Sequence, residues 1–331
     1  MDVATDLATK PQIAGTNSNV TLLNHIDHWL SRFGVRRGRH RVTPGLYALG
    51  APTESSPVFV SANYTLSFDA LRSAARGIDA YILVLDTHGV NVWCAAGKGT
   101  FGTDEIVAKL EETKLEEIVG HRSLIVPQLG APGVAAHEVK RRSGFNVKYG
   151  PVRAEDLREF LKIGKATPEM RKVEFRTTSR AVLVPVEAVH ILLPVLVVNL
   201  GLFLAGIIGS FYNEVFAGIL AGIMLFPLTL PWIPSRDFSS KGYIIGAVAA
   251  LPILLRDLIG NQTSSAYMAA FGAVGSLLLV SAISAFLALN FTGSSTYTSR
   301  TGVKREMYRY IPSMAWSFGI GLILTIVMRI F

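Results

Sequence analysis

The chain has 331 residues, of which 50% are hydrophobic and only 17% charged, and its formal net charge is +8. A wholly soluble chain carries ~25% charged residues, so this composition excludes one and predicts a membrane part. The single cysteine excludes an internal disulfide and any iron–sulfur cluster or zinc site built from four cysteines of this chain.

Charged residues divide the chain into two halves. Only 8 of the 32 lysines and arginines, and 5 of the 24 acidic residues, follow Arg180. We therefore expect a soluble domain large enough to bury its own core, followed by a helical membrane domain. The predicted divisions are an N-terminal basic extension (1–45), an α/β domain (46–165), a basic linker (166–181) and a transmembrane domain (182–331).

The first 45 residues show little regular pattern. The first ten are polar and lack the apolar stretch of a signal peptide. Residues 25–33 have the spacing of a short amphipathic helix, and a basic run follows at Arg36, Arg37, Arg39 and Arg41. We expect a solvated tail in contact with anionic lipid, and no nucleic-acid binding, because no recognition motif accompanies the charge.

From Pro57 onward, short β-branched runs alternate with helical stretches. Strands are expected at 58–61, 80–85, 124–126 and 145–148, and helices at 68–76, 104–119, 135–142 and 154–162. This βαβ succession predicts a Rossmann-like, parallel, doubly wound sheet. Thr103 is expected to cap the longest helix, with Asp104 and Glu105 at the positive end of its dipole.

In such a sheet, ligands bind beyond the carboxyl ends of the strands. The segments that leave those ends are 62–64, 87–102, 128–133 and 149–151, which places Asn63, Tyr64 and Gln128 near a bound ligand. The second segment dominates, because it contains the only thiol, a tryptophan and three glycines in the run Asn91-Val92-Trp93-Cys94-Ala95-Ala96-Gly97-Lys98-Gly99-Thr100-Phe101-Gly102.

Three general interpretations of this run are weak. Gly97, Gly99 and Gly102 have the spacing of a dinucleotide fingerprint, but that motif should follow its strand directly. A P-loop is excluded, since its first glycine and its hydroxyl residue are missing. A catalytic cysteine needs a base, for which only His88 and His121 are nearby, and a buried structural thiol does not explain the flanking residues.

The segment from Asn91 to Lys98 closely resembles the cap-helix signature of the mercury-methylating corrinoid protein family. Residues 44–47, 56–58 and 62–64 look like the corrinoid domain of the corrinoid iron–sulfur protein of the acetyl-CoA pathway. The resemblance implies a base-off corrinoid with the Cys94 thiolate as lower axial ligand of cobalt. Its implied binding residues are Asn91, Val92, Trp93, Ala95, Ala96, Gly97, Lys98, Gly99 and Thr100.

Each residue type suits this role. Ala95, Ala96, Gly97 and Gly99 are small enough for the backbone to approach a flat ring, and Asn91 can cap the turn. Lys98 and the positive end of a helix dipole would favour the ionised thiol that a metal ligand requires. A competing resemblance is to cobalamin modules similar to that of methionine synthase: Asp86-Thr87-His88 matches most of the motif that places histidine on cobalt, although Asn91 replaces its glycine.

By the same resemblance, the protein is a corrinoid-dependent methyltransferase that forms methylmercury from Hg(II). A methyltetrahydrofolate-linked donor would supply the methyl group to cobalt(I), and thiolate ligation favours its transfer as carbanion or radical. The cysteine-rich cluster domain of the corrinoid iron–sulfur protein is absent, so a ferredoxin-like 4Fe–4S partner is implied as reductant. That partner is also expected to deliver Hg(II), because the only thiol is committed to cobalt. A membrane-tethered corrinoid methyl carrier for another acceptor remains an alternative.

Apolar runs at 182–209, 214–233, 243–260, 266–291 and 310–328 predict five membrane spans. The loops that contain Arg236 and Lys241, and residues 300–309, are basic, whereas the other loops have no lysine or arginine. The positive-inside rule therefore predicts a multi-pass protein of the inner (cytoplasmic) membrane, with the α/β domain cytoplasmic and the C-terminus outside. Glu187 and His190 form an ionisable pair in the first span, for which helix packing is expected rather than transport.

Overall fold

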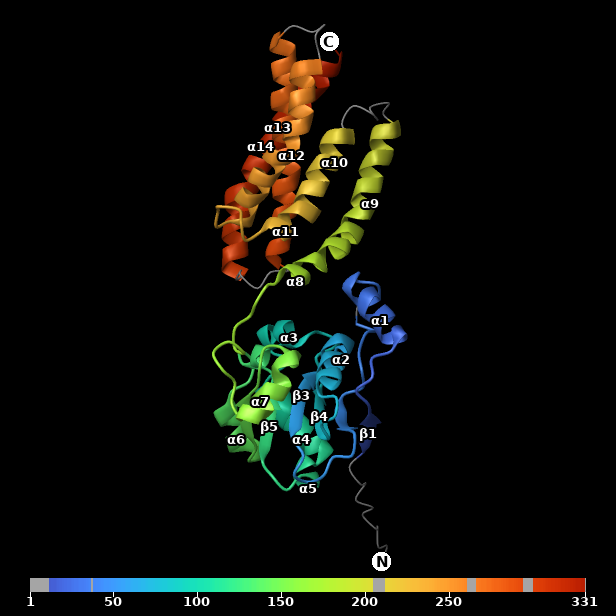
Figure 1. The fold of residues 1–331 in the computed structure, drawn as a ribbon, viewed down its shortest axis with the longest axis vertical. Coiled ribbons are helices and arrows are strands. Elements are labelled where there is room, and N and C mark those ends of the chain that lie inside the picture. Colours follow the sequence, from blue (N-terminus) through green and yellow to red (C-terminus); the bar gives the residue numbers. More distant parts are fainter. Residues whose placement is uncertain (1–11, 37, 205–211, 261–265, 294–299, 331) are drawn as a thin grey trace, which may run out of the picture. The chain divides into compact units, whose positions relative to one another are not determined.

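The computed structural model describes residues 12–36, 38–204, 212–260, 266–293 and 300–330. It divides into two compact units, Met1–Val173 and Glu174–Phe331 (Figure 1). The first unit is an α/β domain and the second consists of helices. This arrangement confirms the predicted fold class, an α/β domain followed by long apolar helices.

A six-stranded sheet in the order β1-β2-β4-β3-β5-β6 forms the centre of the first unit. Strands β3 to β6 pair in parallel, as the βαβ pattern predicts, but β2 is antiparallel to β4. β2 was not among the predicted strands, and it makes the sheet mixed at this edge, where it joins without a helical crossover. The strands are β1 (Ile13–Thr16), β2 (Gly45–Leu49), β3 (Val58–Ala62), β4 (Ala80–Leu85), β5 (Ser123–Val126) and β6 (Asn146–Tyr149).

Helices cover both faces of the sheet (Figure 1). On one face, α2 (Thr65–Ala74) and α7 (Leu157–Ile163) contribute Phe68 and Phe160 to the core. On the other, α4 (Thr103–Thr113), α5 (Leu115–Ile118) and α6 (Ala136–Ser143) contribute Ile106, Leu115 and Val139. Because β3 and β4 are covered on both sides, every residue of both strands is buried, as expected of central parallel strands.

The longest predicted helix, 104–119, is interrupted. Lys114 has φ 47° and ends α4, and the separate turn α5 follows it. Thr103 does not cap α4, because Gly102 is the N-cap residue; the Thr103 hydroxyl instead accepts a hydrogen bond of 2.9 Å from the Ala135 amide at the start of α6. Thr103 therefore joins two helices on one face of the sheet.

The N-terminal residues that the structure describes are not a solvated tail. β1 pairs with β2, and α1 (Leu22–Arg32) is held by polar contacts to the domain. Asp27 accepts from both His40 Nδ1 (2.6 Å) and the Thr65 hydroxyl (2.7 Å), and His28 lies 2.8 Å from Asp69. Residues 1–11 and Arg37 lie outside the described residues.

His40 is the centre of this contact. Its Nδ1 faces Asp27, and its Nε2 faces the Val35 carbonyl at 2.6 Å. Burial opposes the charged form, but the hydrogen bonds to Val35 and Asp27 and the Asp27 charge outweigh it and raise the pKa of His40. Burial also acts against ionisation of Asp27, while hydrogen bonds from His40 and Thr65 lower its pKa overall.

Among the residues of the second unit that the structure describes, five segments are long and apolar enough to cross a membrane: 177–197, 212–229, 238–259, 267–290 and 301–327. They agree with the predicted runs, although the last begins at Thr301 rather than 310, and residues 205–209 of the first run lie outside the described residues. α13 is the most buried of them and contacts α10, α12 and α14. The helices are α8 (Thr177–Ala181), α9 (Leu183–Leu204), α10 (Tyr212–Leu220), which continues through a π-helical turn (Ala221–Leu225) into α11 (Phe226–Thr229), α12 (Phe238–Gly260), α13 (Ala266–Asn290) and α14 (Arg300–Ile330).

Candidate functional site

A hollow of about 350 Å³ lies at the carboxyl ends of the central strands. In the sheet, β4 lies on one side of β3 and β5 lies on the other side of β3. The chain therefore reverses its winding direction between β3 and β5. Ligands of doubly wound sheets bind at such a switch point. The hollow is lined by Val60 and Ser61 of β3, by Ile125 of β5, and by Val92 and Trp93 from the connection that contains the cysteine.

That connection forms a short helix, α3 (Val92–Lys98), with defined ends. The Asn91 side-chain oxygen accepts a 2.9 Å hydrogen bond from the Cys94 amide, which satisfies one of the free N–H groups of the first turn. At the other end, Gly99 has φ 87°, a left-handed conformation that suits glycine. Cys94 is therefore held in the first turn of a capped helix, and its side chain is exposed.

The two sides of α3 differ in exposure. Val92, Ala95 and Ala96 are buried, with Ala95 fully inaccessible, whereas Trp93, Cys94, Gly97 and Lys98 are exposed. Ala95 and Ala96 belong to the domain core, so their side chains do not lie on the exposed side of α3. On the exposed side, a Cβ atom added at Gly97 would meet no atom within 4 Å. Gly97 leaves open space one turn away from the thiol.

α3 lies close to the turn after β5, η1 (Gln128–Gly130). A Cβ atom at Gly133 would lie 2.2 Å from the Phe101 carbonyl oxygen and 3.1 Å from the Ala96 Cα atom. Only small residues allow these backbones to approach each other. Ala96 and Gly133 therefore explain why α3 sits beside the end of β5.

Asn63 has a different role from the predicted one. Its side chain is fully buried, and its Oδ1 atom accepts from the Thr87 amide (3.1 Å), the Thr87 hydroxyl (2.9 Å) and the Gly89 amide (3.0 Å). Its Nδ2 atom donates to Asp86 Oδ1 (3.0 Å). Asn63 therefore fixes the turn that leads from β4 into α3, and has no exposed atom with which to contact a cofactor.

The other predicted residues are partly accessible. The Tyr64 hydroxyl accepts a 2.8 Å hydrogen bond from Ser31, so it belongs to the contact with α1. Gln128 Oε1 and Thr100 Oγ1 are buried oxygens with no hydrogen-bond partner in the part of the chain that the structure describes. Such atoms are uncommon in folded proteins and suggest a ligand or water that completes them. Tyr64, Thr100, Gln128 and Cys94 do not line the hollow, which has Asn91, Val92 and Trp93 at its edge.

The two histidines considered as bases occupy different places. His121 Nε2 lies 2.9 Å from the Ser56 carbonyl, at the amino ends of β3 and β5. It is therefore at the opposite edge of the sheet from the connection that follows β4, and cannot serve Cys94 as a base. His88 is exposed, and its Nδ1 atom lies 3.5 Å from Asp86, so the alternative histidine ligand shares the Cys94 edge of the sheet.

Comparisons with known proteins concern this domain. Residues 35–161 match the family described as the CO dehydrogenase/acetyl-CoA synthase delta subunit. The chain is 35% identical over 127 residues to the acetyl-CoA decarbonylase/synthase complex subunit gamma of Methanopyrus kandleri, which covers 38% of this chain and 27% of the relative. It is 30% identical over 129 residues to the corrinoid/iron-sulfur protein large subunit of Moorella thermoacetica, covering 38% and 28%. The α/β domain is similar in sequence to a part of these proteins.

The chain spans about a quarter of the length of these relatives. The family match begins after α1 and ends before the second unit, so the long apolar helices lie outside it. The similarity to these relatives therefore concerns the α/β domain alone.

The α/β domain presents an exposed surface beside its single thiol. The exposed side of α3 combines Cys94 with the open space at Gly97. A thiolate is a ligand that transition metals accept. A flat, metal-containing macrocycle seated on this side of α3 is compatible with these residues.

Glu214 of α10 is a buried acidic residue that was not among the predicted functional residues. Its carboxyl group is fully buried, and Oε1 accepts a 3.2 Å hydrogen bond from Ser276 on α13. The same hydroxyl lies 3.5 Å from Asp257 of α12. The sequence signal for Glu214 is a single acidic residue in an otherwise apolar run. His190, of the expected pair, is exposed.

Proposed function

We propose that this protein is a membrane-anchored, corrinoid-dependent methyltransferase whose acceptor is Hg(II) and whose product is methylmercury. The observation that carries the proposal is the exposed Cys94 thiol in the first turn of the capped helix α3, at the carboxyl edge of a sheet related to corrinoid proteins. The resemblance of residues 91–98 to the mercury-methylating family supports the choice of acceptor.

In this proposal the Cys94 thiolate is the lower axial ligand of cobalt, and the corrinoid is base-off. When bound, the corrinoid supplies a metal that accepts and releases methyl groups. Asn91 orients the first turn, Gly97 leaves room for the ring, and Lys98 provides a positive charge on the same side of α3. As a strongly donating ligand, the thiolate suits transfer to an electrophile such as Hg(II).

The second unit would anchor the protein in the inner (cytoplasmic) membrane through its five apolar segments. The basic loops support a cytoplasmic α/β domain and an external C-terminus. The proposed partners are a ferredoxin-like 4Fe–4S protein as reductant and a methyltetrahydrofolate-linked methyl donor. Since Cys94 is the only cysteine, Hg(II) would be delivered by the ferredoxin-like partner, because this chain has no second thiol to capture it.

Cys94→Ala tests the ligand assignment. We expect the purified variant to change the absorption spectrum of bound corrinoid and to lose methylmercury formation in cells, while its α/β domain remains folded, because the side chain is exposed. Cys94→His, which retains a metal ligand, serves as the comparison. A Cys94→Ala variant with a wild-type spectrum and wild-type methylmercury yield would refute the axial thiolate, and a spectrum changed instead by His88→Ala would assign the histidine.

A corrinoid methyl carrier for another acceptor is the second candidate. It is favoured by the relatives, which are named as subunits of the acetyl-CoA decarbonylase/synthase complex and of a corrinoid/iron–sulfur protein. The two functions use the same site, so variants of Cys94 do not separate them. Analysis of methylated products with and without Hg(II) does: a second methylated product that forms at an unchanged rate without Hg(II) would favour the carrier.

A further inference from the structure

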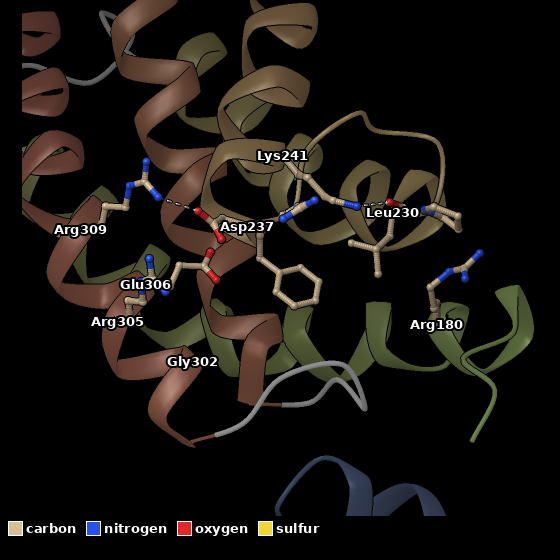
Figure 2. A pocket seen from close by; sticks show the side chains of 11 residues that line it. Arg180, Leu230, Asp237, Lys241, Gly302, Arg305, Glu306 and Arg309 are labelled. Atoms are coloured by element: carbon tan, nitrogen blue, oxygen red, sulfur yellow. Dashed lines mark hydrogen bonds and ion pairs between the residues drawn. The ribbon is translucent and has the colours of Figure 1, made fainter. Parts of the chain in front are cut away.

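A hollow of about 690 Å³ lies entirely within the second unit, at one end of its helices. Its walls come from the end of α8, the end of α11, the start of α12 and the first turns of α14 (Figure 2). Figure 2 shows Arg305 and Arg309 on one side and Arg180 on the other. Five cationic side chains line it: Arg180, Arg236, Lys241, Arg305 and Arg309.

The two acidic residues of the hollow are already engaged. Glu306 is buried, and its Oε1 atom accepts from the Ser239 amide (2.5 Å) and hydroxyl (2.8 Å), which caps the first turn of α12. Asp237 accepts from the Tyr310 hydroxyl (2.9 Å) and lies 3.5 Å from Arg309. The acids therefore stabilise the wall and leave a net positive charge facing the hollow.

Arg180 has a buried donor atom without a hydrogen-bond acceptor in the described structure. Its side chain is buried; Nη1 donates to the Phe175 carbonyl (2.6 Å) and Nη2 to the Thr177 hydroxyl (2.9 Å). Its Nε atom is also buried and has no partner within the described ranges. Arg236 and Arg305 are exposed and form no ion pair with any described residue. A buried N–H without an acceptor is costly, so an acceptor supplied from outside the chain would stabilise this arrangement.

We propose that this hollow binds a phosphate-type oxyanion. Guanidinium groups match the geometry of phosphate oxygens and bind them in a bidentate manner. Leu230, Pro231 and Phe238 provide an apolar wall beside the cations, which suits a phosphate attached to an apolar group. The phosphate can come from the headgroup of an anionic phospholipid or from a soluble phosphate compound. Both use the same cationic residues.

The test compares Arg305→Gln with Lys304→Gln in the full-length protein. Both residues are exposed and adjacent, and both variants remove one positive charge, but only Arg305 lines the hollow. Inorganic phosphate binding is measured by calorimetry in a zwitterionic detergent, and retention of phosphatidylglycerol over phosphatidylcholine is measured by native mass spectrometry. We expect Arg305→Gln to weaken binding about tenfold, equivalent to ~1.4 kcal/mol, and Lys304→Gln to leave it unchanged.

The two sources give different results. Selective retention of phosphatidylglycerol that inorganic phosphate does not displace would identify a lipid headgroup, and phosphate binding without lipid selectivity would identify a soluble ligand. Equal binding by the two variants, or no binding of either probe by the wild-type protein, would overturn the proposal. The wall is not disturbed by the change, since Arg305 forms no ion pair within the described residues.

A second, independent observation concerns α1, whose orientation is opposite to that of an ordinary surface helix. Its polar residues Asp27, His28 and Ser31 form the contacts with the domain. Its apolar residues point outward: Leu22 is 75% exposed and Leu23 76%, and Ile26, Trp29 and Leu30 are also exposed. No residue of α1 is buried. Its hydrophobic side therefore lacks a covering element in the described structure.

Basic residues surround this apolar face. The Arg32 guanidinium lies 5.5 Å from the centre of the Trp29 ring. Arg36, Arg39 and Arg41 follow α1, are exposed, and form no ion pair in the described part of the chain. Exposed leucine, isoleucine and tryptophan bordered by arginine are typical of helices that lie in the interface of an anionic membrane. The charge of the surroundings therefore complements a lipid surface.

We infer that α1 lies in the interfacial region of the bilayer, with Leu22, Leu23, Ile26, Trp29 and Leu30 among the lipid headgroups. This inference rests on the membrane anchoring proposed above. The first apolar segment begins at Thr177, four residues after the first unit ends at Val173. Once that segment is inserted in a membrane, the connection acts as a tether and raises the effective concentration of α1 at the lipid surface.

Photo-crosslinking in membranes tests this contact. Benzoylphenylalanine replaces Leu23 in the full-length protein, and Glu116, an exposed residue of α5, serves as the control position. We expect lipid adducts from position 23 and none from position 116, identified by mass spectrometry. Protein adducts or no adduct from position 23 would overturn the inference. Resistance of the same protein to carbonate extraction reports separately whether the apolar segments anchor it in the membrane. A result against the anchoring is therefore distinguished from a result against the contact between α1 and lipid.

Discussion

Asn63→Ala should release the turn that positions α3. The substitution removes an acceptor from three hydrogen bonds and leaves the amides of Thr87 and Gly89 without partners. Thr87 is fully buried, so water cannot replace the lost acceptor without movement of the turn. At ~1–3 kcal/mol for each unsatisfied group, the cost is about 2–6 kcal/mol. A large part of the stability of a typical domain, ~5–15 kcal/mol, therefore depends on one side chain.

If the turn opens to solvent, water can bind the unsatisfied amides. We therefore expect a local increase in mobility rather than a fall in melting temperature that corresponds to the full ~2–6 kcal/mol. Hydrogen–deuterium exchange measured by mass spectrometry should show faster exchange in peptides that cover residues 86–99, with little change in β5. Ser61→Ala is the matched control, because Ser61 is also buried in β3 but donates only to the carbonyl of its neighbour Ala62, at 3.2 Å. Identical exchange in wild-type, Asn63→Ala and Ser61→Ala proteins would refute the positioning role.

Two further predictions concern helix ends and protonation. Asn91→Ala should weaken the cap of α3 by ~1 kcal/mol and speed exchange of the Cys94 amide, whereas Asn91→Asp, which keeps the acceptor, should not; equal rates in both variants would contradict the cap. The His40 contact stabilises α1 fully below the ordinary His pKa of 6.5, and its contribution is lost as pH rises through the raised pKa of His40. Exchange of α1, corrected for the intrinsic rate, should therefore increase toward alkaline pH, and His40→Gln should remove this dependence. The lowered pKa of Asp27 has the opposite sign, so its contribution is lost as pH falls through that value.

The regular part of the fold was predictable because its signals are local. Buried parallel strands are continuous apolar runs, and β3 and β4 follow that pattern, whereas β5 and β6 are shorter and only partly buried. The β2 edge was not predictable in this way, since an antiparallel pairing with β4 depends on a partner distant in sequence. No glycine or proline lies at Lys114 to predict the interruption of the helix there. The inverted face of α1 depends on hydrogen bonds to His40, Thr65 and Asp69, which no periodicity reveals.

In the candidate site, too, local features could be predicted, whereas features that depend on distant residues could not. The capping of the turn by Asn91 is a local signal and could be predicted, whereas the helix that it begins, which ends at Gly99, was not among the predicted helices. The inward direction of Ala95 and Ala96 could not, because it depends on how α3 packs against residues after β5. Asn63 was assigned to the ligand from its position after β3, whereas its buried amide accepts hydrogen bonds from the backbone of the next turn, because an amide can serve the backbone as well as a ligand.

Gly97 provides the sharpest distinction between fold and function. Glycine within a helix costs ~1 kcal/mol relative to alanine, and no neighbouring atom within 4 Å requires it here. The fold therefore gives no packing reason for glycine, whereas a ring seated on Cys94 does. We expect Gly97→Leu to fold with an unchanged or slightly higher melting temperature and to lose corrinoid loading, measured by absorbance after reconstitution. Glu111→Leu, at an exposed position of α4, should load normally. Full loading of Gly97→Leu would show that the macrocycle does not occupy this side of α3, even if Cys94 remained essential for activity.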